Sequence, residues 1–311
     1  MTDQNRGVLF TLGAFVLWGL VPIYFKLLTG VEAFEILAHR IIWSVLALVA
    51  VMLLLKRSIL VKAILKKPEL RRTLFISAIL ISVNWLIFAW AVTHDQILAT
   101  SLGYFINPLV SVMLGMIVLG ERLSRNQYLA LMLVVLAIAN QIWSFGELPW
   151  VALSLALSFG FYGLLRKRAD VDAYNGLLVE VLLMLPFAMA YLLWKMQAGT
   201  LVFTQQSTMM DINLFLSGLV TTIPLVLFAA GAKLIRLSIV GFIQYIAPSI
   251  TFLLAVLYYN EPLGVERLIS FVLIWVALIL ISIDAYRENR RARRKRQEEN
   301  SSSADSHNEA G

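Results

Sequence analysis

The chain contains no cysteine and is poor in charged residues and histidine. Its 311 residues include 0 Cys, 3 His and only 14% charged side chains. The absence of cysteine excludes a disulfide framework, a thiolate metal site and a cysteine nucleophile. A water-soluble globule needs a polar surface, and 14% charged beside 60% hydrophobic residues cannot supply one. The composition therefore predicts an integral membrane protein whose main partner is the lipid bilayer.

Long apolar runs occupy most of the chain. About 20 apolar residues cross a hydrocarbon core of about 30 Å as a helix. No small-residue cleavage motif ends the first run, so we expect it to remain as a helix and not to be removed as a signal peptide. We predict an all-α membrane protein with ten transmembrane helices, near 8–28, 35–55, 73–92, 97–119, 128–145, 149–165, 175–194, 213–232, 237–259 and 266–285.

Lysine and arginine predict the orientation of these helices. With the N-terminus in the cytoplasm, the basic clusters at 56–72, 166–168 and 287–296 all fall on the cytoplasmic side. The tail 287–311 is basic and then polar, as in a disordered cytoplasmic tail. We therefore expect both termini in the cytoplasm. The net charge of +7 is explained by this topology and does not indicate a nucleic-acid partner.

The sequence contains an internal repeat with an offset of about 140 residues. This offset superposes Ser77 on Ser217, Arg40 on Glu180, Pro108 on Pro248, and Glu121 on Glu261, and an offset of 141 superposes Lys26 on Lys167. Each repeat holds five predicted helices, so the second copy enters the membrane in the opposite direction. We expect two inverted five-helix repeats, 1–145 and 146–286, as in secondary transporters.

Polar residues recur on single faces of several predicted helices. Tyr104 and Pro108 are four residues apart, as are their repeat mates Gln244 and Pro248. We expect such faces to wall a polar cavity near the membrane midplane, with Pro108, Pro224 and Pro248 bending their helices. The expected substrate-binding residues are Trp18, His39, Arg40, Asn84, Trp85, Tyr104, Asn107, Tyr162, Glu180, Thr221, Gln244 and Tyr245. The serines and threonines alternatively bond their own helix, and the aromatic residues alternatively pack in the core.

Arg40 and Glu180 are charged groups inside predicted spans. Such a group costs about 2.5–3.5 kcal/mol at the centre of an inserted helix, so it needs a partner or water. Their predicted depths differ, so we expect no direct ion pair between them. We expect Glu180 to have no fixed cationic partner and to carry proton coupling. Glu121 and Glu261 lie at helix ends, where capping is sufficient to explain them.

Several stretches together carry a family resemblance: ILAHRIIWS, VNWLIFAWAV, SLGYFINPLVSVMLGMIVLGERL, LSFGFYGLLRKR, GLVTTIPL and GFIQYIAPS. Over most of its length the chain resembles EamA-type members of the drug/metabolite transporter superfamily, in particular the RarD branch. The resemblance implies ten helices in two inverted EamA repeats, in a bacterial inner membrane. It also implies a permease for a small molecule, in a branch linked to chloramphenicol sensitivity.

We therefore expect a secondary transporter that moves a small organic metabolite or drug by alternating access. We expect no catalytic residue, cofactor or metal, and the coupling ion is expected to be the proton. The alternative is an intramembrane enzyme that acts on a lipid-soluble substrate. It would need paired acids or clustered metal ligands, whereas His39 has no neighbouring histidine in the sequence and Glu180 is the single acid in mid-span. No GxxxxGK[ST] loop occurs, so ATP is not the direct driver.

Overall fold

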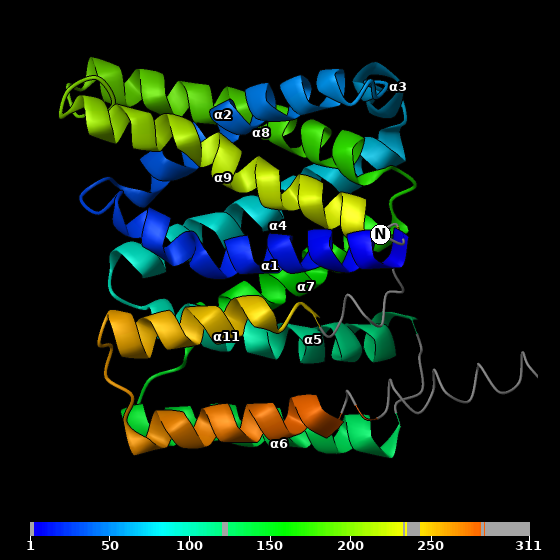
Figure 1. Ribbon diagram of the computed structural model, residues 1–311, viewed down its shortest axis with the longest axis vertical. Coiled ribbons are helices and arrows are strands. Elements are labelled where there is room, and N and C mark those ends of the chain that lie inside the picture. The colour runs from blue at the N-terminus through cyan, green and yellow to red at the C-terminus, as the bar shows by residue number, and fades with distance from the viewer. Residues whose placement is uncertain (1–2, 120–123, 233, 235–242, 281–282, 284–311) are drawn as a thin grey trace, which may run out of the picture.

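The computed structural model describes residues 3–119, 124–232, 234, 243–280 and 283. Within these ranges every regular element is a helix (Figure 1). The helices are α1 (Asp3–Lys26), α2 (Ala33–Leu54), α3 (Val61–Leu65), α4 (Pro68–Thr93), α5 (Ile97–Leu119), α6 (Arg125–Phe145), α7 (Trp150–Arg168), α8 (Ala173–Gln197), α9 (Thr208–Ala232) and α11 (Ile246–Leu253). The π-helix η1 (Leu254–Tyr258) continues α11, and residues 265–280 are also helical.

The described helices are those of a membrane protein. Six are long and apolar enough to cross a bilayer, and shorter apolar helices cover Ile97–Asn107, Trp150–Arg166 and Ile246–Tyr258. The predicted all-α class is confirmed. Parts of the expected spans 237–259 and 266–285 lie outside the described residues, as do Glu121 and the tail 287–311.

Two local features differ from the sequence expectation. The basic segment 56–72 contains the short helix α3, and α4 then begins at Pro68, five residues before the expected start. Proline is favoured in the first turn of a helix, where its missing N–H has no partner to lose. Residues 244–245 form a turn, and Pro248 lies in the first turn of α11, where its missing N–H removes no intrahelical hydrogen bond. Pro248 therefore follows a helix start, and the expected span 237–259 is not one continuous α-helix.

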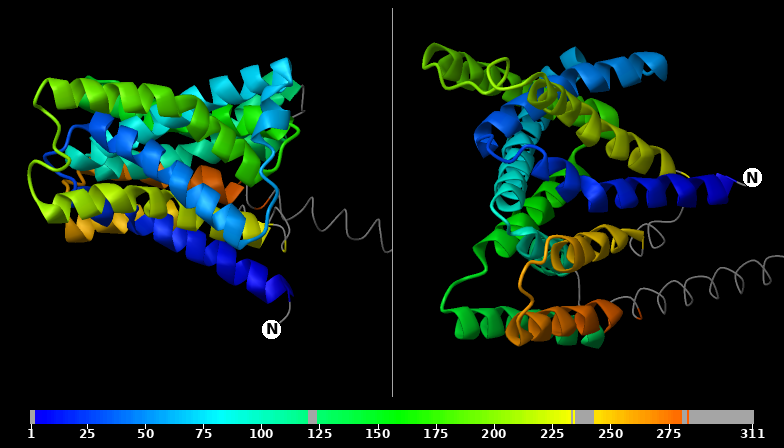
Figure 2. Two further views of the ribbon diagram at one scale, coloured as in Figure 1. Left: turned by 90° about the horizontal axis from the view of Figure 1, so that it is seen from above. Right: turned by 60° about the vertical axis from the view of Figure 1, so that its left-hand side comes forward.

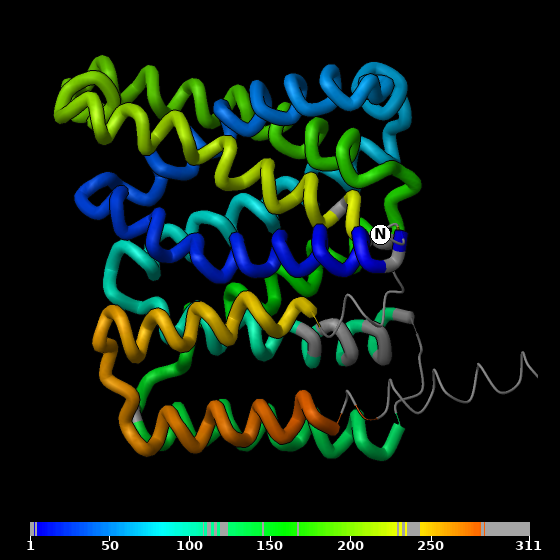
Figure 3. Tube along the Cα trace, in the orientation of Figure 1, coloured from blue at the N-terminus to red at the C-terminus, as the bar shows by residue number. Residues whose placement is uncertain are grey.

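The helices lie side by side across the long axis of the molecule (Figures 1 and 3). The contacts that organise the bundle are α1 with α9 and α11, α2 with α8 and α9, α4 with α7, and α5 with α7 and α11. At one edge, α6 pairs with the helix 265–280 (Figure 2). The Asn140 amide joins this pair, because it donates to the Glu266 carbonyl at 2.7 Å and the Ser270 hydroxyl at 2.9 Å.

The two ends of the bundle carry different segments. The N-terminal end of α1 and helix α3 lie at the same end, on the right in Figure 1. The connection between α1 and α2 lies at the opposite end. This arrangement places the basic segment 56–72 at the same end as Arg6, as the charge pattern predicts.

Candidate functional site

Glu180 lies at the centre of a polar cluster inside the bundle. Its side chain on α8 is buried, and its Oε1 accepts a hydrogen bond of 2.6 Å from the Ser77 hydroxyl on α4. The Tyr162 hydroxyl on α7 donates to Oε2 at 3.4 Å. The Arg166 Nε, also on α7, lies 3.7 Å from Oε1. The expectation that Glu180 has no fixed cationic partner is therefore wrong.

The local sequence explains how α7 reaches Glu180. Tyr162 and Arg166 are one turn apart and lie on the same helix face. Gly176 on α8 leaves room for the arginine, because a Cβ atom there would collide with the Arg166 guanidinium. The sequence prediction counted Arg166 only with the cytoplasmic basic cluster. Its spacing from Tyr162 was the signal that places it in the site.

Arg40 has a different environment. Its side chain on α2 is 91% buried, since its relative exposure is 9%, and its Nε donates to the Thr221 hydroxyl on α9 at 2.6 Å. Its Cζ lies 4.3 Å from the centre of the Trp85 ring and 5.5 Å from that of Phe25. No ion pair involves Arg40 among the residues whose structure is known. As expected, Arg40 and Glu180 do not form an ion pair with each other.

An amide network lies next to Trp85. The Asn84 amide nitrogen donates to the Leu155 carbonyl and to the Ser158 hydroxyl, each at 3.0 Å. The Tyr104 hydroxyl donates to the Asn84 carbonyl oxygen at 3.3 Å. Asn84 on α4 thus connects α5 and α7, and these bonds satisfy an amide that is 1% exposed.

The remaining expected residues have other surroundings or positions. His39 is buried, its Nδ1 faces the Trp43 Nε1 at 3.2 Å, and its ring contacts Phe203. Trp18 packs against Phe15 and Phe228. These contacts give both residues a packing role. The half-buried Asn107 and the buried Pro224 lie within α5 and α9, whereas the half-buried Gln244 and Tyr245 form the turn before α11 instead of lying within a helix; the side chain of Pro108 lies outside the described structure.

A second ionic cluster, which the sequence interpretation missed, lies at the end of the bundle opposite α3. Glu35 is 0% exposed and accepts hydrogen bonds from Lys195 Nζ at 2.8 Å and from the backbone N–H of Val202 and Phe203 at 2.8 and 3.2 Å. Lys195 also contacts Glu32 at 3.0 Å. This hydrogen bond lowers the pKa of the Glu32 carboxyl below its usual value.

Glu261 caps the N-terminus of α5. Its carboxylate oxygens accept the backbone N–H groups of Ile97 at 2.7 Å and Leu98 at 2.8 Å. The first N–H groups of a helix have no intrahelical partner, so a buried carboxylate satisfies them directly. Burial raises the pKa of Glu261 despite these two bonds. The capping interpretation is confirmed for Glu261, whereas Glu121 lies outside the described residues.

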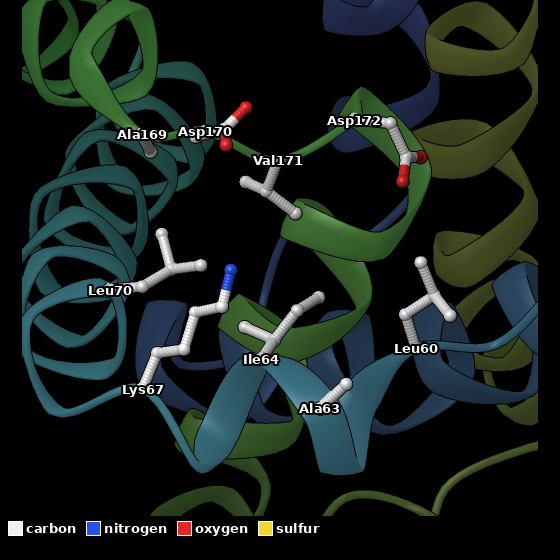
Figure 4. Close-up of a pocket in the computed structure, with 9 residues that line it drawn as sticks. All are labelled: Leu60, Ala63, Ile64, Lys67, Leu70, Ala169, Asp170, Val171 and Asp172. Atoms are coloured by element: carbon white, nitrogen blue, oxygen red, sulfur yellow. The ribbon is translucent and has the colours of Figure 1, made fainter.

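Surface cavities occur at both ends of the bundle. A cavity of about 510 Å³ lies between α3, the start of α4 and the connection 169–172, and the Lys67 side chain extends into it (Figure 4). Another, of about 710 Å³, lies near the α1–α2 connection and is bordered by Glu32, Trp90 and Trp150. Neither cavity includes Arg40 or Glu180 in its lining.

Comparisons with known proteins identify the family. The sequence model of the EamA-like transporter family matches residues 5–140 and again 149–283. The chain is 47% identical to Protein RarD of Salmonella typhi over 283 residues, which cover 91% of this chain and 96% of that protein. It is 45% identical to Protein RarD of Escherichia coli, over 93% of this chain and 98% of the relative.

Two further comparisons agree with this assignment. A relative from Vibrio cholerae, described as an uncharacterized transporter, is 43% identical over 94% of this chain and 97% of its own length. A solved crystal structure shares the fold, with a TM-score of 0.59 at 16% identity, over 91% of this chain and 98% of that one. The chain belongs to the EamA-like transporter family and is a membrane transporter of the RarD type.

Proposed function

We propose that this transporter is a secondary active permease that moves a small organic metabolite or drug across a bacterial inner membrane by alternating access. In this proposal, the two halves, 1–145 and 146–286, are inverted five-helix repeats with both termini in the cytoplasm. The double match to one family supports a duplicated architecture. The basic segments 56–72 and 166–168, which occur at the ends of helices that return to one side, support the orientation.

The observation that carries the proposal is a reciprocal exchange of polar contacts between the halves. Arg40 of the first half donates to Thr221 of the second. Glu180, the repeat mate of Arg40, accepts from Ser77 of the first half. Helices α2 and α8 are repeat mates, and so are α4 and α9. Each half therefore binds its charged residue to the other half, as expected for two copies related by a pseudo-two-fold axis.

A second reciprocal pair lies near the ends of the bundle. Glu35 accepts the backbone N–H of Val202, in the connection after α8. Its repeat mate Asn175 accepts the backbone N–H of Leu60, in the connection after α2, at 2.8 Å. Glu35 on α2 thus binds the connection that follows α8, and Asn175 on α8 binds the connection that follows α2. Alternating access requires comparable closures at both ends, and these matched contacts support it.

We assign the proton coupling to Glu180 together with Arg166. The ion pair and the Ser77 bond stabilise the carboxylate in the present arrangement. A buried carboxylate that loses a hydrogen-bond donor binds a proton more readily. If rocking of the two halves withdraws Ser77, on α4 of the first half, from Glu180, on α8 of the second half, Glu180 takes up a proton in one state and releases it in the other. This cycle couples the proton gradient to the movement of the solute.

Vesicles loaded with a deproteinised bacterial metabolite extract test the proposal. Purified protein is reconstituted in one set of vesicles and omitted from another, and mass spectrometry measures the retained solutes over time. The transporter is expected to deplete a small group of solutes with saturable kinetics. An intramembrane enzyme would change solute or lipid masses without moving them outward. Vesicles with and without protein that retain every solute equally would contradict the proposal.

A further inference from the structure

The charge of Arg40 has no counter-ion in the known part of the structure. Its guanidinium has one hydrogen bond, to the neutral Thr221 hydroxyl, and two aromatic neighbours. The nearby Tyr24 and Tyr104 do not supply a counter-ion, because their hydroxyls donate hydrogen bonds to the Asn213 carbonyl and to Asn84. Aromatic faces stabilise a cation only in part, while removal of an arginine from water carries a larger penalty. An anion at this position would offset the remaining penalty.

The second half of the chain provides an internal comparison. Glu180, the mate of Arg40 at an offset of 140, has Arg166 as its counter-ion at 3.7 Å. At the offset of 141 that relates α1 to α7, the mate of Arg166 is Phe25. The second half has the Arg166 cation at this position, which balances the charge of Glu180. The first half has the aromatic ring of Phe25 there. Phe25 lies beside Arg40, so the counter-ion position next to Arg40 is occupied by an apolar side chain.

From this we propose, on the basis of the transport function proposed above, that Arg40 binds the carboxylate of a singly charged organic acid, and that such acids are the transported class. Thr221 occupies Nε, which leaves the two terminal nitrogens with N–H groups in one plane. This edge matches the two oxygens of a carboxylate. Trp85 and Phe25 provide apolar faces for the body of the acid.

The local charge favours a single negative charge on the ligand. Arg166, the half-buried arginine of the clusters described above, already pairs with Glu180. A doubly charged phosphate would therefore meet one uncompensated cation and keep one negative charge away from water. A neutral molecule would leave the Arg40 charge as it is. A monocarboxylate with an apolar or ring-bearing body compensates the charge and uses the aromatic faces.

Binding of matched acids and amides tests this inference. Purified protein in detergent, at constant pH and chloride, is titrated with benzoate, phenylacetate and acetate and with the corresponding neutral amides, and bound ligand is measured calorimetrically. At least one acid is expected to bind at least about tenfold more tightly than its amide, because the amide lacks the charge that pairs with Arg40. Equal affinity of every acid and its amide, or binding of none of the acids, would overturn the inference.

Variants locate the binding. Arg40→Gln is expected to abolish acid binding, and Arg40→Lys, which keeps the charge but not the planar pair of donors, to weaken it about tenfold. Arg72→Gln, which removes an exposed arginine from α4, is the matched control and should bind as the parent does. Unchanged acid binding in folded Arg40→Lys or Arg40→Gln would contradict the assignment. Displacement of the acid by millimolar chloride would identify the site as one for inorganic anions.

The vesicle experiment separates this inference from the proposed function. If neutral or cationic solutes leave the loaded vesicles and organic acids do not, transport is established and the assignment of Arg40 to a carboxylate fails. If no solute leaves, the proposed function itself fails. If monocarboxylates leave vesicles that contain the parent protein, and vesicles that contain Arg40→Gln retain them, both the proposed function and the assignment of Arg40 hold.

Discussion

Arg166 and Glu180 form an ion pair between α7 and α8, with 3.7 Å between Nε and Oε1, and no equivalent pair exists at the corresponding position of the first half. There, Arg40 and Phe25 occupy the equivalent positions. The duplicated scaffold thus carries two unlike polar clusters. In one, Glu180 is paired with Arg166, and in the other, Arg40 has no ion pair among the described residues.

Glu180→Gln tests the role of the neutral cluster. The glutamine keeps the size and an acceptor for Ser77 but cannot exchange a proton. Exchange of solute across the vesicle membrane is expected to continue, while accumulation driven by an imposed pH gradient is lost. Both are measured with the solutes identified by the efflux experiment, and Glu266→Gln, at an exposed glutamate, is the control. Gradient-driven accumulation with unchanged pH dependence would assign Glu180 a structural role.

The orientation is accessible to cysteine labelling because the chain has no native cysteine. A single cysteine at Lys66 is expected to react with a membrane-impermeant maleimide only after permeabilisation of the cells. A cysteine at Glu147 is expected to react in intact cells. Glu147 is preferred to its neighbour Gly146, whose φ of +68° does not suit a residue with a Cβ. The reverse labelling pattern would exclude cytoplasmic termini.

Loss of the Glu261 carboxylate is expected to destabilise the start of α5. Glu261→Ala leaves the backbone N–H groups of Ile97 and Leu98 without their acceptor, at a cost of about 2 kcal/mol in the free energy of unfolding. Thermal unfolding in detergent measures the effect, and Glu266→Ala, nearby and exposed, is the control. Equal unfolding midpoints for the two variants would show that the cap contributes nothing.

The sequence predicted the architecture better than the chemistry of the site. Hydropathy located the helices because each span must satisfy its own backbone in lipid. The repeat offset related Arg40 to Glu180, but it gave no information on their partners. The partner of Glu180 is Arg166, which the rules of membrane topology assign to the cytoplasmic face. A long arginine side chain can instead turn into the bundle where a glycine such as Gly176 leaves space.

The cluster around Glu35 could not be predicted in the same way. Glu35 and Lys195 are separated by 160 residues, so their meeting depends on the packing of α2 against α8. An acid at a helix start is ordinarily explained by the helix dipole alone. Glu35 is buried and accepts hydrogen bonds from the backbone N–H groups of residues 202–203, because the chain returns toward α2 after α8.

Acid pH is expected to weaken this cluster through Glu32. The hydrogen bond from Lys195 lowers the pKa of Glu32 in the folded chain below 4.5. A lowered pKa in the folded state contributes stability above the ordinary pKa, and this contribution is lost as the pH falls through the folded value. The difference in unfolding midpoint between the parent and Glu32→Gln should therefore shrink below about pH 4.5. A difference that grows on acidification would contradict the assigned sign.

Trans-stimulation of solute exchange tests alternating access most directly. Reconstituted vesicles are loaded with one solute that the protein transports, and its efflux is measured with and without the same solute outside. A carrier returns faster when it is loaded, so external solute is expected to accelerate efflux in a saturable manner. Efflux that rises in proportion to concentration and does not respond to external solute would indicate an open pore and contradict the account.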